Sequence, residues 1–141
     1  MVRLLDNFDF SIAKEHLSLG RRGLQDRNWS SANGQFRNFM EALFIGICKK
    51  ILPNIECKNS ATAIRELGKT ATPPFFSAEL NETEYTGCKN PFVVGLWTRL
   101  HPQGSHPGLS DEDDATFRFH ITVVFAYYLL NRLDERIKAL Y

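Results

Sequence analysis

The stretch Asn28–Leu52, NWSSANGQFRNFMEALFIGICKKIL, decides the fold because it is the clearest helix in the chain. Its large apolar side chains recur every three or four residues, which is the spacing of one face of an α-helix. They are Phe36, Phe39, Met40, Leu43, Phe44, Ile47 and Ile51. Asn28 is a candidate N-cap, and Pro53 ends the pattern because proline has no amide hydrogen to donate. The stretch therefore predicts a long helix with one buried face.

Two shorter helices are predicted on either side of this stretch. The first covers about residues 10–24, and two glycines, Gly20 and Gly23, weaken its end. Its predicted buried face consists of Ile12, Ala13, Leu17 and Leu24. The other short helix runs from a cap at Ser60 to a stop at Gly68.

Two more helices are predicted after an irregular Pro-rich excursion over residues 69–89. Asn90 followed by Pro91 is a typical helix start, and this helix continues to about His101. The last helix begins at Ser110, and the acidic run DEDD that follows lies at the positive end of the helix dipole. The whole pattern predicts an all-α fold, a bundle of four to five helices with one irregular insertion.

Length and composition favour a single domain over residues 1–141. The formal net charge of +1 gives no overall attraction to nucleic acid, so a polyanion would have to be held by a local cluster. The richest apolar run, ITVVFAYYLL, is too short to span a bilayer, and the first residues hold no long apolar run. We therefore expect no association with a membrane.

The chain has three cysteines, Cys48, Cys57 and Cys88, an odd number without the spacing of a metal knuckle. This pattern predicts reduced thiols in a cytoplasmic protein, with Cys48 in the core. No cofactor is predicted.

Side chains that can do chemistry gather between the last two helices, in the segment RLHPQGSHPG at Arg99–Gly108. Arg99 is predicted in the last turn of one helix, and His106 lies just before the start of the next. Side chains in these two places can converge on one point outside the helix ends. A guanidinium can hold a phosphate whose charge grows in the transition state, and an imidazole can move a proton near neutral pH. The pair therefore suits cleavage of a phosphodiester bond without a metal.

This segment resembles the Arg-x4–6-His signature of HEPN domains, a family of all-α bundles, because six residues separate Arg99 from His106. The stretch SHPGLSDEDDATFRFHITVVFAYYLLNRL is similar to the C-terminal helix region of HEPN-like domains in bacterial abortive-infection proteins. Asn28–Leu52 is similar to the paired helix of the same bundles. The resemblance covers most of the chain and leaves the Pro-rich excursion as an insertion.

The resemblance implies a metal-independent endoribonuclease that acts in phage defence or as a toxin. It implies that Arg99 binds the phosphate and stabilises the transition state, and that His106 is the general base or acid. The expected products are a 2′,3′-cyclic phosphate and a 5′-hydroxyl. Active HEPN proteins typically dimerise with both copies of the pair in one cleft. The implied partners are therefore RNA, a second copy of the chain, and an antitoxin or sensor domain.

One position departs from the family pattern. Many active members have Asn, Asp or His directly after the arginine, where this chain has Leu100. His101 and Ser105 are the candidates for supplying the missing polar group. Some HEPN domains have lost activity, so the alternative is a non-catalytic sensor or interaction module that binds a nucleotide, RNA or a partner protein.

Plainer interpretations of these residues stay open. Arg99 can neutralise the negative end of its helix or pair with one of the acids that start the next helix. His106 can be a loop histidine bonded to a backbone carbonyl. The histidines and nearby acids match no compact metal-site spacing, so no metal is predicted. His120 is expected to be a core or interface histidine.

A basic surface near the first two helices is a less favoured candidate for contact with RNA. Basic residues and aromatic rings together can hold single strands, but such residues are more often a solvated helix end. The residues are Arg21, Arg22, Arg27, Arg37, Trp29 and Phe36.

Overall fold

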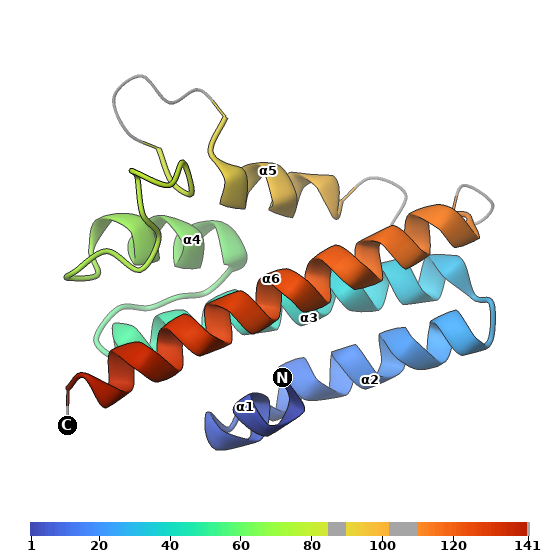
Figure 1. Cartoon of the computed structure of the whole chain (residues 1–141), viewed down its shortest axis with the longest axis horizontal. Helices are drawn as coiled ribbons and strands as arrows, with labels where there is room; N and C mark the ends of the chain where they lie inside the picture. The colour runs from blue at the N-terminus through green and yellow to red at the C-terminus, as the bar shows by residue number, and fades with distance from the viewer. Residues whose placement is uncertain (85–89, 102–109, 141) are drawn as a thin grey trace. The chain divides into compact units, whose positions relative to one another are not determined.

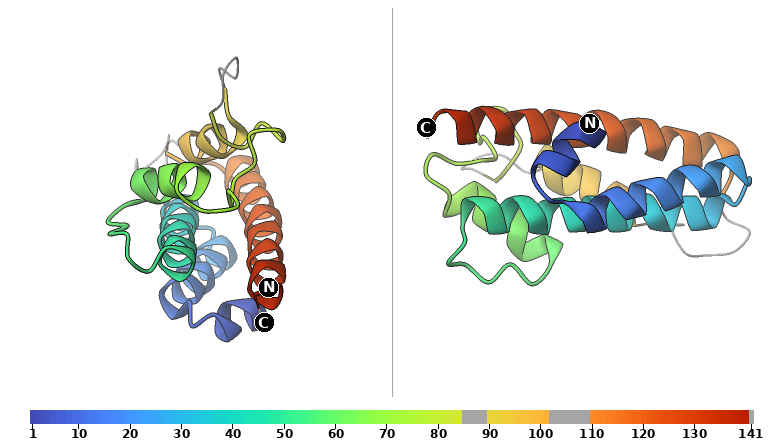
Figure 2. Two further views of the ribbon diagram at one scale, coloured as in Figure 1. Left: turned by 90° about the vertical axis from the view of Figure 1, so that its left-hand side faces the viewer. Right: turned by 90° about the horizontal axis from the view of Figure 1, so that it is seen from below.

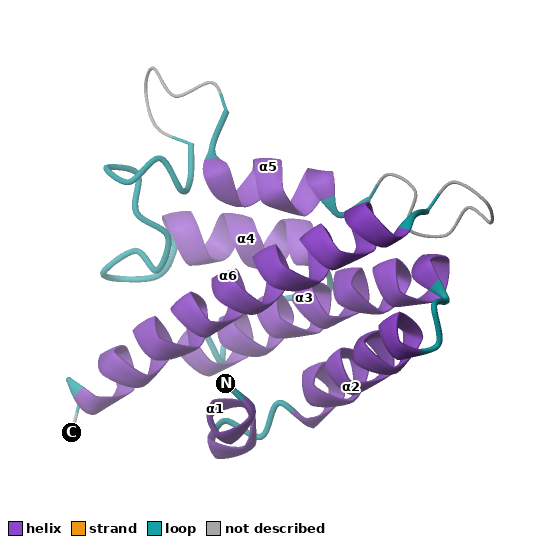
Figure 3. Cartoon of the chain, turned by 45° about the vertical axis from the view of Figure 1, so that its right-hand side comes forward, coloured by secondary structure: helices purple, strands orange, loops and turns teal. Residues whose placement is uncertain are grey.

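The computed structural model describes residues 1–84, 90–101 and 110–140, and all regular structure in these residues is helical (Figures 1 and 3). The helices are α1 (Val2–Asn7), α2 (Ser11–Gln25), α3 (Trp29–Ile51), α4 (Ser60–Lys69), α5 (Phe92–Arg99) and α6 (Glu112–Lys138). The all-α prediction is confirmed for this part of the chain. Five of the helices correspond to predicted ones, and α1 is additional because its 6 residues are too few to give a helical repeat.

The chain divides into two compact units. The first consists of Met1–Leu43 with Gln103–Tyr141, and the second is Phe44–Pro102. Within the first unit, α3 and α6 run in the same direction and α2 runs in the opposite one (Figure 1). Figure 2 shows α2 lying along the first part of α3. The prediction of one domain over the whole chain stays a prediction.

Two glycines on α2 allow it to pack closely against α3. A Cβ at Gly20 would lie 2.5 Å from a ring carbon of Phe36, and one at Gly23 would lie 3.0 Å from the amide nitrogen of Ala32. Both glycines are buried, and the helix continues past them to Gln25. The predicted buried face of this helix was wrong at Ile12, which is 66% exposed, because the glycine side of the helix forms the contact.

Side-chain caps begin α3 and α4. The Asn28 side-chain oxygen accepts a hydrogen bond from the Ser31 amide at 3.2 Å, as expected for an N-cap. The predicted cap of α4 was wrong by one residue. Asn59 has the extended backbone of a cap and accepts from the Thr62 amide at 2.9 Å, so Ser60 becomes the first residue of the helix.

The starts of α5 and α6 also differ from the prediction by one or two residues. Pro91 holds the N-cap position of α5 and not the first helical position. Asp111 caps α6 in place of Ser110, and its carboxylate accepts from the Asp114 amide at 2.8 Å. The carboxylate of Asp111 caps the helix because it is a stronger acceptor than a hydroxyl and because its charge is favourable at the positive helix end. The remaining acids of the run, Glu112, Asp113 and Asp114, lie in the first turn as predicted.

A buried polar cluster joins the starts of α3 and α6 in the first unit. The side chain of Arg118 is 0% exposed, and its Nε donates to the Asp114 carboxylate at 2.7 Å. The Asn33 amide donates to the same carboxylate at 3.4 Å. The rings of Phe36 and Phe119, 5.5 Å apart, pack the same two helices together. The cluster therefore places a charge pair in the interior of the first unit.

The longest helix, α6, is buried along one side and exposed along another. Its buried residues include Phe125, Leu129 and Leu133. Its exposed apolar residues are Phe117, Val124, Tyr127 and Tyr128. In the part of the chain that the structure describes, α6 and the other helices lack an apolar stretch that would suffice to cross a bilayer.

The described part of the Pro-rich excursion is irregular, as predicted, and it contributes to the core of the second unit. Phe75 and Phe76 are buried, and the Phe75 amide donates to the Leu67 carbonyl of α4 at 2.8 Å. The buried carboxylate of Glu82 accepts from the Ser77 amide at 2.8 Å. These bonds satisfy buried polar groups in the absence of regular structure.

The prediction of reduced thiols was wrong for Cys48 and Cys57, and Cys88 lies outside the described residues. Cys48, near the end of α3, and Cys57, in the following loop, form a disulfide with their Cα atoms 6.4 Å apart. The chain reverses after Pro53, which brings together two cysteines that are 9 positions apart. Cys48 is buried, as predicted. The cytoplasmic location stays a prediction, and it can no longer be argued from these cysteines, because disulfides are typical of oxidising compartments.

Candidate functional site

Arg99 is the last residue of α5, and its side chain is exposed. It lies in the last turn of the helix, as the sequence predicts, so its charge also complements the negative helix end. Leu100 is the C-cap and is only 1% exposed. The residue that departs from the HEPN pattern is therefore a core residue, and a polar side chain in its place would be buried.

His101 is held against Trp97 on the same side of the chain. Its Nδ1 lies 2.8 Å from the Trp97 carbonyl oxygen, and the two rings meet edge to face with centroids 4.5 Å apart. Nδ1–H donates in this arrangement, which leaves Nε2 as an acceptor. Because His101 itself is exposed, that nitrogen is available to a ligand or a water. The structure thus brings one supporting residue, His101, to the end of the helix that carries Arg99.

The other two predicted site residues, Ser105 and His106, lie outside the described residues. The segment that contains them is flanked by α5 and α6, as the sequence predicts. The approach of His106 to Arg99 stays a prediction.

Several plainer expectations can be compared with the structure. His120 is exposed, with its ring 5.5 Å from that of Phe119, so the core alternative was wrong, and a place in an interface stays a prediction. Phe36 is 0% exposed and belongs to the core, which removes it from the proposed basic surface. Within the described ranges, no three His, Cys, Asp or Glu side chains lie together in a way that could hold a metal ion.

A groove in the second unit was missed by the sequence analysis. It has a volume of about 270 Å³ and lies between α4 and α5, next to the end of the described excursion. The residues that line it are Ala61, Ile64, Arg65, Lys69, Thr83, Glu84, Val94 and Trp97. The helical spacing of Ala61, Arg65 and Lys69 could have indicated a shared face, but the sequence did not show that α5 lies opposite.

The two cations of the groove have different surroundings. The Arg65 guanidinium bonds to the Glu66 carboxylate at 2.9 Å. The hydroxyl of Thr70, and after it Arg65, hold the pKa of Glu66 below its ordinary value by bonding to the charged form. Lys69 is exposed, and its ammonium projects from the last turn of α4. The groove therefore offers one oriented guanidinium and one adaptable ammonium.

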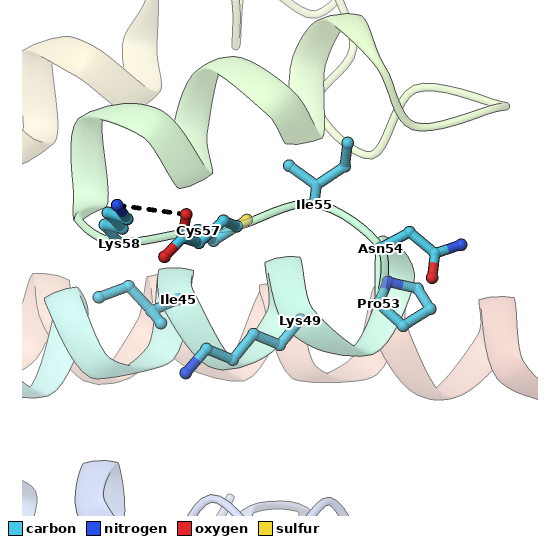
Figure 4. Close-up of a pocket in the computed structure, with 8 residues that line it drawn as sticks. Ile45, Lys49, Pro53, Asn54, Ile55, Cys57 and Lys58 are labelled. Atoms are coloured by element: carbon cyan, nitrogen blue, oxygen red, sulfur yellow. Dashed lines mark ion pairs between the residues drawn. The ribbon is translucent and has the colours of Figure 1, made fainter.

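A second hollow lies under the loop that the disulfide closes (Figure 4). Its volume is about 680 Å³, and it is lined by Ile45 and Lys49 of α3 and by residues 53–58. Lys58 and Glu56 form an exposed ion pair there at 3.2 Å. The hollow contains no aromatic side chain and no histidine, so it offers neither a stacking surface nor a general base.

Comparisons of the chain with protein-family models, with curated proteins and with solved structures find no significant match. The class of this protein is defined by its fold alone, and it is all-α.

Proposed function

We propose that this protein is a metal-independent endoribonuclease of the HEPN type that acts in phage defence or as a toxin. One observation supports this most directly. Arg99 stands exposed at the end of α5, and the chain continues from there into the segment with Ser105 and His106 before it reaches α6. This order of helix, arginine, histidine and helix is the one that the HEPN resemblance requires.

In this proposal Arg99 stabilises the negative charge of the transition state, and His106 transfers a proton. His106 takes the proton from the 2′-hydroxyl, and the 2′-oxygen attacks the adjacent phosphorus. The bond from phosphorus to the 5′-oxygen breaks, that oxygen takes a proton from water, and His106 then returns its proton to the solvent. Arg99 donates hydrogen bonds to the phosphate oxygens, whose negative charge grows in the transition state. The products are a 2′,3′-cyclic phosphate and a 5′-hydroxyl, and the arginine supplies the positive charge that the reaction needs.

His101 and Ser105 are proposed as supporting residues. The Trp97 carbonyl fixes the ring of His101, so its Nε2 has a defined direction near the end of α5. A polar group there can orient the arginine or a water next to the phosphate. This takes the place of the polar residue that active HEPN proteins carry directly after the arginine.

A second copy of the chain is the proposed partner of α6, where it would complete the cleft. Phe117, Val124 and Tyr128 follow each other at helical spacing and are all more than 40% exposed. The first turn of α6 is acidic, and its last turn carries Arg136 and Lys138. In a two-fold antiparallel pair, the acidic end of one α6 therefore lies against the basic end of the other. A second copy would therefore bury the apolar stripe and bring opposite charges together at both ends of α6.

The alternative function is a non-catalytic sensor or interaction module of the same type, which binds a nucleotide, RNA or a partner protein. The burial of Leu100 favours it, because the position that is polar in many active members serves packing here. The two functions differ in turnover, since only the enzyme converts RNA into a cyclic phosphate.

The test of this proposal is cleavage of single-stranded RNA by the purified protein in EDTA. We expect Arg99→Ala to lose at least about a hundredfold in rate, because one donor to a developing oxyanion is worth that much. Arg3→Ala is the control, since Arg3 is an exposed arginine on α1 and belongs to neither candidate RNA surface. Equal rates for the two variants would exclude Arg99 from catalysis, and absence of cleavage by the wild type would favour the sensor module.

A further inference from the structure

The groove between α4 and α5 is built by contacts of the excursion with both helices within the second unit. Gly68 on α4 leaves room for Thr83, because a Cβ there would lie 2.6 Å from the threonine hydroxyl oxygen. The Val93 amide of α5 donates to the Glu82 carbonyl at 3.2 Å. The end of the described excursion is therefore fixed to both helices, and it closes one side of the groove.

The aromatic wall of the groove is held in one orientation. The Trp97 ring meets the ring of Phe44 edge to face at 5.9 Å and that of His101 at 4.5 Å. Trp97 is only half-buried by these contacts and lines the groove together with Ile64 and the exposed side chain of Val94. A fixed indole beside an apolar wall is a surface on which a flat ring can stack at low entropic cost.

The polar groups of the groove lie on both sides of this aromatic wall. Arg65 and Lys69 bring two cations from one face of α4, which suit a phosphate. Thr83 and Glu84 bring acceptors from the excursion, which suit a ribose hydroxyl or a base amino group. A base, a sugar and a phosphate are the ligand chemistry that uses all of these groups.

We propose that this groove binds one unpaired base of a single-stranded RNA, stacked on Trp97, with the neighbouring phosphate at Arg65 and Lys69. The volume of about 270 Å³ lies at the lower end for ligand pockets, so it suits one nucleotide and excludes a base-paired duplex. Stacking of this kind accepts every base, because every base has a flat face.

This inference rests on the proposed ribonuclease function, because it assigns the groove to the substrate. Trp97 and Arg99 lie two residues apart on α5, on nearly opposite sides of a helix about 10 Å across. An RNA strand that passes around the end of α5 therefore reaches both residues within a few nucleotides. The groove would select unpaired RNA and place the phosphate to be cut at a fixed distance from the stacked base.

The test uses the fluorescence of Trp97 in the full chain, with Trp29→Phe removing the other tryptophan. The probe is a short single-stranded RNA with 2′-O-methyl groups throughout, which binds but offers no 2′-hydroxyl for attack. We expect this strand to quench Trp97, and we expect Lys69→Gln to weaken its apparent Kd about tenfold through loss of a charge-assisted contact. Lys50→Gln is the matched control, an exposed lysine in the last turn of α3, and should change the Kd less than about twofold.

Three results would overturn the inference. These are no quenching by the strand, equal weakening by the two lysine variants, and quenching by a duplex or by AMP that is as tight as quenching by the strand. The readout is separate from the ribonuclease proposal. If the protein cuts RNA and the fluorescence of Trp97 does not change, only the groove assignment is overturned. Quenching by the strand in a protein that cuts no RNA supports the groove and contradicts only the enzyme.

Discussion

At the scale of single residues, the most unusual feature is the charge pair in the first unit. Arg118 is 0% exposed, and its partner Asp114 is 13% exposed. Transferring two charges from water costs several kcal/mol each, and their attraction repays this only while both partners are present. The pair also links α6 to Asn33 of α3, so it fixes the start of the helix that follows the candidate site segment.

We predict that Asp114→Asn lowers the free energy of unfolding by about 3 kcal/mol or more, because it leaves the Arg118 charge buried without its carboxylate. The measurement is urea unfolding followed by circular dichroism. Asp134→Asn is the matched control on the same helix, because Asp134 pairs with Lys138 at the same spacing in an exposed position. The control should lose less than about 0.5 kcal/mol. Equal losses of unfolding free energy in the two variants would mean that burial of the Arg118–Asp114 pair does not make it more important for stability than an exposed pair.

Individual residues were predicted less well than helices. The capping positions were one residue off at Ser60 and Ser110, because an Asn or Asp that caps at least as well lies directly before one serine and directly after the other. The Cys48–Cys57 bond was missed because pairing depends on how the chain reverses after α3, which spacing alone does not give. Leu100 was recognised as a departure from the family pattern, but its burial could be seen only in the fold.

At the scale of elements, the close packing of α2 on α3 depends on glycines, which have no side chain to separate the two helices. Gly20 is buried against the ring of Phe36, which is itself 0% exposed. Large apolar residues mark a buried face in a sequence, whereas glycines are usually taken as signs of a weak helix. For this reason the sequence predicted that α2 exists and misplaced its buried face.

Substitution of two helical glycines by alanine should therefore have opposite effects. Gly20→Ala should lower the free energy of unfolding by about 1–3 kcal/mol, because the new Cβ would lie 2.5 Å from the Phe36 ring. Gly95→Ala in α5 should raise it by about 0.5–1 kcal/mol, because a Cβ there meets nothing within 4 Å and alanine favours helix. Thermal unfolding of both variants provides the comparison, and a stabilising Gly20→Ala would contradict the close packing of α2 on α3.

The five helices α2 to α6 were predictable because apolar residues recur at helical spacing in each of them, and caps or stop signals bound most of them. The groove was not predictable in the same way. It combines α4, α5 and the excursion, and contacts that no sequence pattern shows bring them together, among them the hydrogen bonds of Glu82 and the missing Cβ of Gly68. Arg99 and His101 were placed correctly at the end of α5, because the stop signal at Pro102 and Gly104 is local.

At the scale of the whole molecule, the account requires two copies of the chain. The exposed stripe of Phe117, Val124 and Tyr128 should be covered in solution by the same stripe of a second copy. We predict that Val124→Asp gives a monomer by light scattering at concentrations where the wild type is a dimer, because it places two carboxylates close together at the interface. Val124 is 69% exposed, so the variant should keep its helical circular dichroism.

In the same account the monomeric variant loses RNA cleavage, since each cleft needs residues from both copies. Glu15→Gln is the control, an exposed change of charge on α2 that should leave the dimer intact. A wild type that is monomeric at all concentrations would contradict the proposed pairing of α6.

The central claim is that Arg99 and His106 together cleave RNA, and the most direct measurement is the cleavage rate of His106→Ala in EDTA. The substrate is a single-stranded RNA, and the product end is identified by mass spectrometry. The account predicts that the wild type yields a 2′,3′-cyclic phosphate, and that His106→Ala loses about a hundredfold or more in rate while its circular dichroism is unchanged. Equal rates for the wild type and His106→Ala, or a product without the cyclic phosphate, would contradict it.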